Sequence, residues 1–194
     1  MVQSLWFFLT LEQKRVTISI GCVRKDKGMK IRRAREEDIE QTLSIYNDEV
    51  EHGVATLDIH NKTLEQWREW FLHHDEDTHP IYVAEENGRI TGYVSLSPYR
   101  EKEAYCSTVE LSLYVHQEYR KQGLAGALMK TILEDAAKNP RIHTIVSVIT
   151  RGNEASTRLH EKFDFAFCGT IHQVGMKFGT YLDIDNYELI LAKS

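Results

Sequence analysis

From residue 29 onward, apolar and polar residues alternate with a helical period in some segments and a strand period in others. Helical spacing runs through residues 35–50, whose first turn is acidic, as suits the helix dipole. A second helix is predicted over residues 63–74, because Thr63 and Gln66 form a capping-box pattern and four apolar residues share one face. These four are Leu64, Trp67, Trp70 and Phe71. Further helices are expected after residue 119 and over residues 153–163.

Strands are predicted where short apolar runs lie between turn signals. Residues 81–96 are typical of a hairpin, with the turn dipeptide Asn87-Gly88 between two apolar segments. The other expected strands cover residues 29–34, 105–115, 142–150, 165–172 and 187–192. A chain that mixes these strands with three or four helices predicts an α/β or α+β fold built on one mixed sheet.

The segment YRKQGLAGALMKTIL, residues 119–133, places glycines and cationic side chains where a helix is about to begin. Glycine costs backbone entropy in a helix, so glycines at a helix start indicate that another group comes close to the backbone. The first N–H groups of a helix lack partners and carry the positive end of its dipole, which suits a phosphate. A Walker A loop requires Lys-Ser/Thr after its last glycine, and Ala127-Leu128 stands there instead. A dinucleotide fingerprint requires Gly-x-Gly-x-x-Gly, which is also missing.

The strand before this segment, TVELSLYV at residues 108–115, carries a carboxylate in its middle. Side chains alternate between the two faces of a strand, so the four apolar residues from Val109 to Val115 share one face. Glu110 points to the other face with Ser112 and Tyr114. On this strand alone the second face reads as solvated. Its position just upstream of the predicted anion site makes Glu110 a candidate for chemistry.

Length and composition predict a single globular domain. The chain has 194 residues, 42% of them hydrophobic, and a formal net charge of -5, which argues against general nucleic-acid binding. The apolar stretch at residues 5–11 is too short to span a bilayer, so no membrane segment is expected. Residues 1–28 are interpreted as an N-terminal extension, or as an upstream start with Met29 as the natural initiator, and residues 29–194 as the domain. Three cysteines without a framework spacing favour reduced thiols and a cytoplasmic protein.

The pattern Arg120-x-x-Gly123-x-Ala125 resembles the Q/R-x-x-G-x-G/A signature of the GCN5-related N-acetyltransferases, the GNAT superfamily. Three longer segments resemble the branch that acetylates phosphinothricin and methionine sulfoximine. They are TVELSLYVHQEYRKQGLAGALM, HTIVSVITRGNEASTRLHEKFDF and VGMKFGTYLD. The resemblance extends from about Met29 to Leu191. It implies a mixed, mostly antiparallel central sheet of six to seven strands flanked by about four helices.

The resemblance also implies acetyl-CoA as co-substrate, without a metal, and a small-molecule amine as acceptor. The residues it assigns to acetyl-CoA are Leu113, Tyr114, Val115, Arg120, Lys121, Gln122, Gly123, Leu124, Ala125, Gly126 and Asn153. Those it assigns to the acceptor are Arg100, Glu101, Lys102, Glu110, Leu111 and Ser112. Asn153 is also a favoured helix N-cap, and both roles can hold together. Arg100 suits a substrate carboxylate or phosphinate through its fork of donors, or is a solvated loop cation.

The reaction implied is direct attack of a neutral amine on a thioester within a ternary complex. Glu110 is the candidate base and His160 the candidate acid for the departing thiolate, although a helix histidine packed behind the cofactor can equally be structural. The other histidines receive plainer interpretations. His73, His74 and His79 have metal-ligand side chains but lie in a charged loop that is expected to be solvated.

The chain departs from the close branch near the acceptor. Leu57, Leu111, Thr180 and Tyr181 replace the residues usual there, and Asp164 stands where a glycine would suit a left-handed helix cap. The acceptor therefore stays open between a small amino acid or analogue and another amine, such as a polyamine, an aminoglycoside or a protein N terminus. A non-catalytic acyl-CoA-binding module is the alternative of a different class. A homodimer is expected from the resemblance alone.

Overall fold

The structure is a computed structural model that describes residues 28–74 and 77–192. The predicted N-terminal extension lies, except for Gly28, outside the described residues. The strands are β1 (Met29–Arg33), β2 (Ile81–Glu86), β3 (Arg89–Pro98), β4 (Thr108–Val115), β5 (Thr144–Thr150), β6 (Ala166–Lys177) and β7 (Thr180–Ile190). The helices are α1 (Ile39–His52), α2 (Leu64–Leu72), α3 (Leu124–Lys138) and α4 (Glu154–Lys162).

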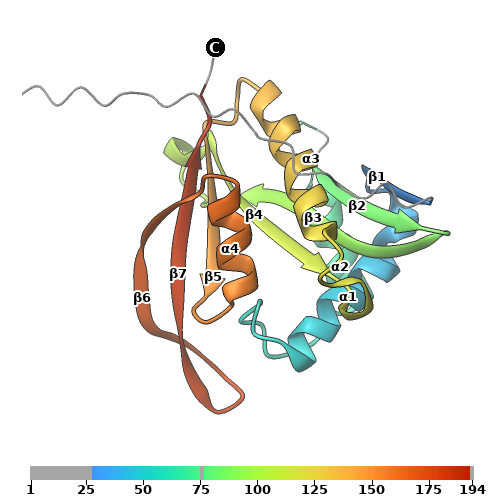
Figure 1. The fold of residues 1–194 in the computed structure, drawn as a ribbon, viewed down its shortest axis with the longest axis horizontal. Coiled ribbons are helices and arrows are strands. Elements are labelled where there is room, and N and C mark those ends of the chain that lie inside the picture. Colours follow the sequence, from blue (N-terminus) through green and yellow to red (C-terminus); the bar gives the residue numbers. More distant parts are fainter. Residues whose placement is uncertain (1–27, 75–76, 193–194) are drawn as a thin grey trace, which may run out of the picture.

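The seven strands form one sheet in the order β1-β2-β3-β4-β5-β7-β6 (Figure 1). Every neighbouring pair is antiparallel except β4 and β5, which run parallel. These findings confirm the predicted mixed, mostly antiparallel sheet with four helices.

The two faces of the sheet carry separate apolar cores, because successive side chains of a strand point to opposite faces. On β3, Val94 joins the larger core with α3, while Tyr93 joins the smaller core with α1 and α2. Figure 1 shows α3 and α4 over one face and α1 and α2 on the other. Trp67 of α2 is buried in the smaller core, as predicted, and its indole N–H donates to Thr42 Oγ1 at 3.0 Å. The capping box predicted at Thr63 is also present.

The parallel strands β4 and β5 pair over only a short stretch, which opens a gap at the centre of the sheet. The two strands pair only over residues 108–110 and 144–146, and beyond these residues they diverge. Glu110 is therefore the last residue of β4 that pairs with β5, at the base of a fork. A sheet with such a fork offers a gap between two strand edges in which a ligand can lie.

Several element boundaries differ from the sequence-based predictions for local reasons. The first long helix begins at Ile39, because residues 36–38 form a 3-10 turn in which Asp38 accepts hydrogen bonds from Arg32 and from the backbone N–H of Arg35. Tyr105 ends a 3-10 turn, so β4 starts only at Thr108. Leu64 is 40% exposed and does not join the apolar face of α2.

The last hairpin is longer than predicted, because β6 reaches Lys177 and β7 already begins at Thr180. Register shifts interrupt the pairing of these strands, between Phe167 and Gly169 and between Ile171 and Gly175, which obscures the period-2 pattern in the sequence. The hairpin extends beyond the rest of the sheet at the lower edge of Figure 1.

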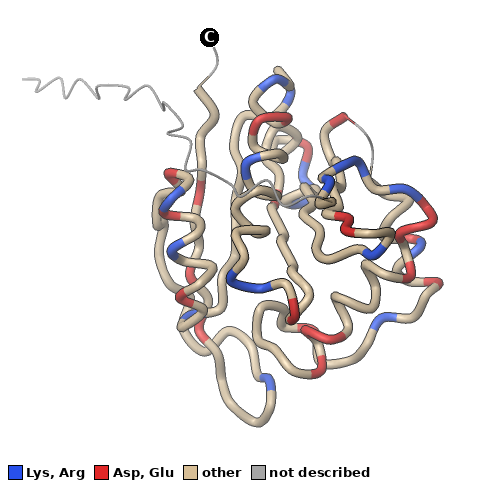
Figure 2. Tube along the Cα trace, turned by 45° about the vertical axis from the view of Figure 1, so that its right-hand side comes forward, with Lys and Arg blue, Asp and Glu red and all other residues tan. Residues whose placement is uncertain are grey.

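Charged residues of both signs are interspersed along the chain, and α4 carries both (Figure 2). Among the described residues, no helix combines the length and the apolar character needed to cross a membrane.

Candidate active site

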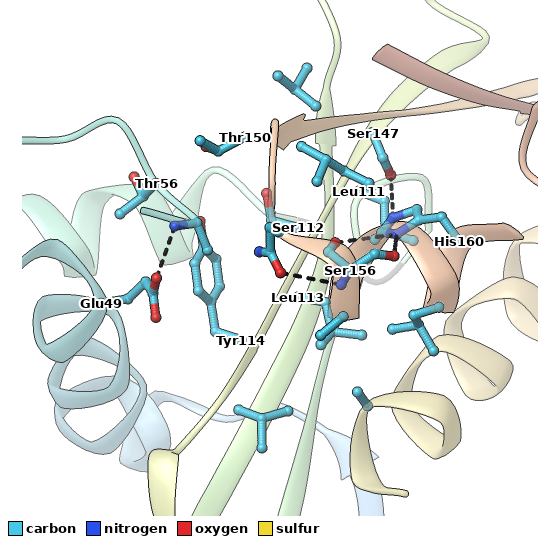
Figure 3. Close-up of a pocket in the computed structure, with 18 of the residues that line it drawn as sticks. Glu49, Thr56, Leu111, Ser112, Leu113, Tyr114, Ser147, Thr150, Ser156 and His160 are labelled. Carbon is cyan, nitrogen blue, oxygen red and sulfur yellow. Dashed lines mark hydrogen bonds between the residues drawn. The ribbon is translucent and has the colours of Figure 1, made fainter. Parts of the chain in front are cut away.

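A cavity of about 550 Å³ opens in the fork between β4 and β5. Its walls come from β4, β5, the first two turns of α4, the end of α1 and the loop that follows α1. Figure 3 shows Glu49, Thr56 and Tyr114 on one side of β4, and Ser147, Ser156 and His160 on the other. The cavity therefore joins the two faces of the sheet at the fork.

The predicted anion site lies at the start of α3, beside this cavity. Gly123 is the N-cap residue and has a φ of 85°, a left-handed conformation that glycine adopts without strain. An added Cβ at Gly123 or at Gly126 would meet no atom within 4 Å, so the space over the first turn is open. The turn thus presents free N–H groups and the positive end of the dipole to that space.

The residues predicted to bind acetyl-CoA fall into two groups. Those that line the cavity are Leu113, Tyr114, Val115, Arg120, Ala125 and Asn153. Those that lie outside its lining are Lys121, Gln122, Gly123, Leu124 and Gly126, which form the turn and the first residues of α3. A ligand that extends from the fork to the start of α3 would contact both groups.

The edge of β4 that faces the fork is free over residues 111–115. On its other edge β4 pairs with β3 along its length, but β5 takes up only residues 108–110. An extended chain with amide groups can pair with such an edge as an added strand. This supports the expectation that the pantetheine amides of acetyl-CoA bind here.

Arg120, the first residue of the family signature, has a structural role that its sequence position did not indicate. Its Nε donates to the carbonyl oxygen of Val115 at 3.0 Å, and its terminal Nη2 donates to Glu49 Oε2 at 3.0 Å. Its side chain is thus used within the protein and fixes the loop before α3 against β4 and α1.

Asn153 caps α4, as one of its two predicted roles required. Its side-chain oxygen accepts a hydrogen bond from the backbone N–H of Ser156 at 3.3 Å. Because Asn153 also lines the cavity, the predicted contact with acetyl-CoA stays compatible with the cap.

Glu110 lines the cavity at the base of the fork and is half-buried, so its face of β4 is not simply solvated. Burial raises the pKa of its carboxyl group, and the positive charge of Arg100 opposes this shift in part. The carboxylate is therefore more basic than an exposed glutamate.

The remaining residues predicted to contact the acceptor lie at different depths. Leu111 and Ser112 line the cavity. Arg100 is exposed beside the cavity, and its guanidinium donates to the Tyr99 hydroxyl at 3.3 Å and packs over the Tyr99 ring. Glu101 and Lys102 are exposed in the same loop and do not line the cavity.

His160 lines the cavity but is only 4% exposed, with both ring nitrogens in hydrogen bonds. Nδ1 lies 2.8 Å from the carbonyl oxygen of Ser156 and Nε2 lies 3.0 Å from Ser147 Oγ (Figure 3). A carbonyl oxygen only accepts, so Nδ1 carries the proton and Nε2 accepts from the serine hydroxyl. Burial lowers the pKa of His160, which keeps the ring neutral near pH 7. This geometry supports the structural role; the acid role stays a prediction.

Several polar residues of the cavity wall were not predicted from the sequence, among them Glu49, Thr56 and Ser147. Glu49 lies one turn after Ile45 on the buried side of α1, so a carboxylate on an otherwise apolar helix face was a signal that could have indicated it. Ser147 interrupts the apolar run of β5 in the same way.

A hydrogen-bonded network holds the loop between α1 and α2 at the mouth of the cavity. The Tyr46 hydroxyl donates to Asp58 at 2.6 Å and lies 2.9 Å from Thr56 Oγ1. The buried ammonium of Lys177, on β6, donates to the backbone carbonyl oxygens of Glu49 and Thr56. Burial lowers the pKa of Lys177, against the charges of Glu49 and Asp58.

The loop that was expected to hold solvated histidines contains one that is partly buried and hydrogen-bonded. His74 is half-buried, and its ring nitrogens lie 2.7 Å from the carbonyl oxygen of Trp70 and 3.0 Å from Ser97 Oγ. Among the described residues, no set of histidine, cysteine and acidic side chains is placed to hold a metal ion.

Comparison with known proteins gives consistent matches. The family model "Acetyltransferase (GNAT) family" matches residues 39–165. The chain is 38% identical over 163 residues to a phosphinothricin N-acetyltransferase of Streptomyces coelicolor, a match that covers 82% of this chain and 95% of the relative. It is 33% identical over 163 residues to an L-methionine sulfoximine/L-methionine sulfone acetyltransferase of Salmonella typhimurium, with 84% and 95% covered.

A solved structure aligns with the same part of the chain. It is a phosphinothricin acetyltransferase of Sinorhizobium meliloti in complex with acetyl-CoA, 27% identical, with a TM-score of 0.79. The match covers 86% of this chain and 90% of that one.

Proposed function

The chain belongs to the acetyltransferase (GNAT) family, and we propose that it transfers an acetyl group from acetyl-CoA to the α-amine of a small amino acid or amino-acid analogue. The observation that carries this proposal is the cavity at the fork of β4 and β5, which joins Glu110 to the open first turn of α3. Phosphinothricin and methionine sulfoximine, the substrates named for two relatives, are the acceptors to test first.

In this proposal acetyl-CoA occupies the fork and the start of α3. The free edge of β4 at residues 111–115 binds the pantetheine amides, and the backbone N–H groups after Gly123 bind the pyrophosphate. Asn153 contacts the co-substrate while it caps α4. When bound, acetyl-CoA supplies the acetyl group as a thioester.

Glu110 acts as the base that removes the proton of the acceptor amine, directly or through a water. An α-amine with a pKa of about 8 needs only about 1.4 kcal/mol to lose its proton at pH 7. A carboxylate whose pKa is raised by burial offsets this cost, since it holds a proton better than an exposed one. Direct attack needs no acyl-enzyme, so neither Cys106 nor Cys168, which are exposed thiols, has to act as a nucleophile.

Arg100 and the α1–α2 loop select the acceptor. Arg100 offers its fork of donors to a substrate carboxylate near Glu110. Leu111 and Leu57 line the cavity where the close branch has other residues, which leaves a different amine as the second candidate. A non-catalytic acyl-CoA-binding module is disfavoured by the half-buried carboxylate at the fork.

The enzyme is further proposed to act as a cytoplasmic homodimer. The hairpin β6–β7 carries large apolar side chains that are about half exposed or more, an unusual concentration for a free surface. They are Phe167, Ile171, Val174, Met176, Phe178 and Tyr181. Sedimentation equilibrium of the wild type and of Phe178→Ser would test this: a dimer weakened by the substitution is expected, and a wild-type monomer would refute it.

Thiol release from acetyl-CoA, measured against a panel of amines, tests the activity. The panel contains methionine sulfoximine, phosphinothricin, ordinary amino acids, spermidine and a peptide. Turnover confined to amino acids and their analogues is expected. Turnover only with spermidine or the peptide would leave the chemistry and overturn the acceptor, and acetyl-CoA binding without any turnover would support the binding module.

A further inference from the structure

A second cavity, of about 460 Å³, lies under α2 on the α1–α2 face of the sheet. It shares Tyr46, Ser112 and Tyr114 with the cavity at the fork, so the two cavities adjoin at these side chains. Its floor is β3, where Tyr93, Ser95 and Ser97 face it. The two tryptophans of α2 form its roof.

The floor carries polar groups that the fold does not satisfy. Three buried side-chain polar atoms of the described residues have no hydrogen-bond partner, and two of them, Tyr93 OH and Ser95 Oγ, belong to residues that line this cavity. Tyr93 is 1% exposed and Ser95 is 0% exposed. A buried hydroxyl without a partner loses its bonds to water and gains none in the protein, so such groups call for an explanation.

The strand register places the Ser95 hydroxyl near Glu110, while Tyr93 lies opposite Tyr114, further along the same face. Ser97 lies directly opposite Glu110 in the β3–β4 pair, and Ser95 lies opposite Ser112. Ser95 is therefore the diagonal neighbour of Glu110 on the same face, a separation of about 7–8 Å between backbones. An amino acid whose amine lies at Glu110 can extend a side chain such as that of glutamine or methionine to Ser95.

The charge of the second cavity favours an uncharged ligand group. Its acidic and basic lining residues, Asp58 and Lys62, pair with each other at 2.8 Å. Burial alone would raise the pKa of Asp58, but hydrogen bonds from Lys62 and Tyr46 lower it, and the ion pair leaves the cavity lining without an uncompensated charge. The other polar side chains of the lining carry hydroxyls, the Gln66 amide and the indole N–H groups of the two tryptophans.

We propose that this second cavity is the side-chain pocket of the acceptor, and that Tyr93 and Ser95 bind an uncharged polar group with acceptor oxygens, such as an amide, a sulfoxide or a sulfone. The inference rests on the proposed amino-acid N-acetylation and adds to it a pair of specificity-determining residues. A hydroxyl both donates and accepts, so two of them can serve the two oxygens of one sulfone. A site built to hydrogen-bond a substrate group discriminates against the analogue that lacks it, because its own polar groups then stay unpaired.

The experiment compares methionine sulfone with methionine, which differ by the two oxygens alone. For Ser95→Ala and Tyr93→Phe, KM for methionine sulfone is expected to rise about tenfold, as for the loss of one hydrogen bond. KM for methionine and for acetyl-CoA should stay within about twofold of the wild-type values. Thr91→Val is the matched control, because it removes a buried hydroxyl of the same strand that already bonds the carbonyl oxygen of Ala84 and does not line the cavity.

Direct binding separates this inference from the proposed activity. Trp67 and Trp70 line the pocket, so their fluorescence reports a titration with either amino acid without acetyl-CoA. Sulfone binding that Ser95→Ala weakens supports the pocket even if the wild type acetylates no amino acid, an outcome that would refute only the activity. Equal effects of the substitutions on both amino acids, or no effect on either, would overturn the pocket.

Discussion

Arg120 and Glu49 join the loop before α3 to the end of α1 through an ion pair of 3.0 Å. The second carboxylate oxygen of Glu49 accepts a hydrogen bond from the backbone N–H of Ala55 at 2.8 Å. One nearly buried carboxylate thus holds the proposed pyrophosphate loop and the proposed acceptor loop in a fixed relation. The two halves of the site are linked by side chains as well as by the sheet.

Glu49→Gln is expected to weaken both halves at once. An amide has one acceptor oxygen, so glutamine must lose either the bond from Arg120 or the bond from Ala55. We expect KM for acetyl-CoA and for the acceptor each to rise about three- to tenfold, since the bonds lost are worth about 1 kcal/mol. Steady-state kinetics with each substrate varied in turn measures both.

Arg120→Gln removes the ion pair with Glu49 and should destabilise the fold by only about 1 kcal/mol. The loss is small because half of the arginine side chain is exposed and water screens the pair. Combined with Glu49→Gln it forms a double-mutant cycle, in which a coupling energy distinguishable from zero is expected. The exposed pair Arg35–Glu37 provides the control, and Glu37→Gln should change nothing. Additive effects of the two substitutions on KM would contradict the coupling.

Glu110→Gln is expected to lower kcat by about 10²–10⁴, the range for loss of a general base, with acetyl-CoA binding unchanged. Since burial raises the pKa of Glu110, the acid limb of the wild-type rate profile should lie above the ordinary glutamate value of 4.5. Rate profiles from pH 4 to 9 check both points. A variant that keeps the wild-type rate would remove Glu110 from the mechanism.

The same pKa shift has a consequence for stability. A carboxyl group whose folded pKa is raised favours folding when protonated, and this contribution is lost as the pH rises through that pKa. Above that pKa the ionised, half-buried Glu110 is therefore unfavourable, and Glu110→Gln should raise the melting temperature at pH 9, the upper end of the rate profiles. Near pH 4, where the wild-type group is protonated, the two proteins should melt alike. Calorimetry at the two pH values decides this.

The parts of the fold that the sequence predicted are those whose signals are local. Thr63 and Gln66 lie three residues apart and form the capping box, and Asp164 adopts the left-handed φ of 61° that its position required. The divergence of β4 from β5 was not predictable, because it depends on pairing between distant segments. The position of Glu49 on a buried helix face was a local signal, but its ion pair with Arg120, 71 residues away, was not predictable for the same reason.

Ser147→Ala tests the tautomer of His160. The serine hydroxyl donates to Nε2, and its loss would leave a buried nitrogen unpaired, at a cost of about 1–3 kcal/mol. A smaller cost measured by chemical denaturation would mean that Nε2 finds another partner.

His160 should also make stability depend on pH. A histidine whose folded pKa is lowered stabilises the fold above its unfolded value of 6.5, and this contribution is lost as the pH falls through the folded pKa. We expect wild-type stability to fall on acidification below pH 6.5 and the fall to be smaller in His160→Gln. The acid role makes a separate prediction about the rate. If His160 donates the proton, kcat of the wild type decreases as the pH rises past the lowered pKa of His160.

Gly123→Ala and Gly126→Ala are expected to have opposite effects on stability and the same effect on acetyl-CoA. Gly123 has a left-handed φ of 85°, so alanine there costs about 1–2 kcal/mol. Gly126 lies within α3 with open space at its Cβ position, so alanine should stabilise the free protein by up to about 1 kcal/mol.

Binding of acetyl-CoA tests whether Gly126 makes room for the ligand. If the pyrophosphate approaches the first turn of α3, a methyl group at residue 126 occupies its space, and the ligand should raise the melting temperature of Gly126→Ala far less than that of the wild type. Ala127→Gly is the matched control, because it changes helix propensity at a buried neighbour outside the cavity lining. A full ligand-induced shift in Gly126→Ala would place the phosphates elsewhere, since the glycine would then be neither required by the backbone nor used by the ligand.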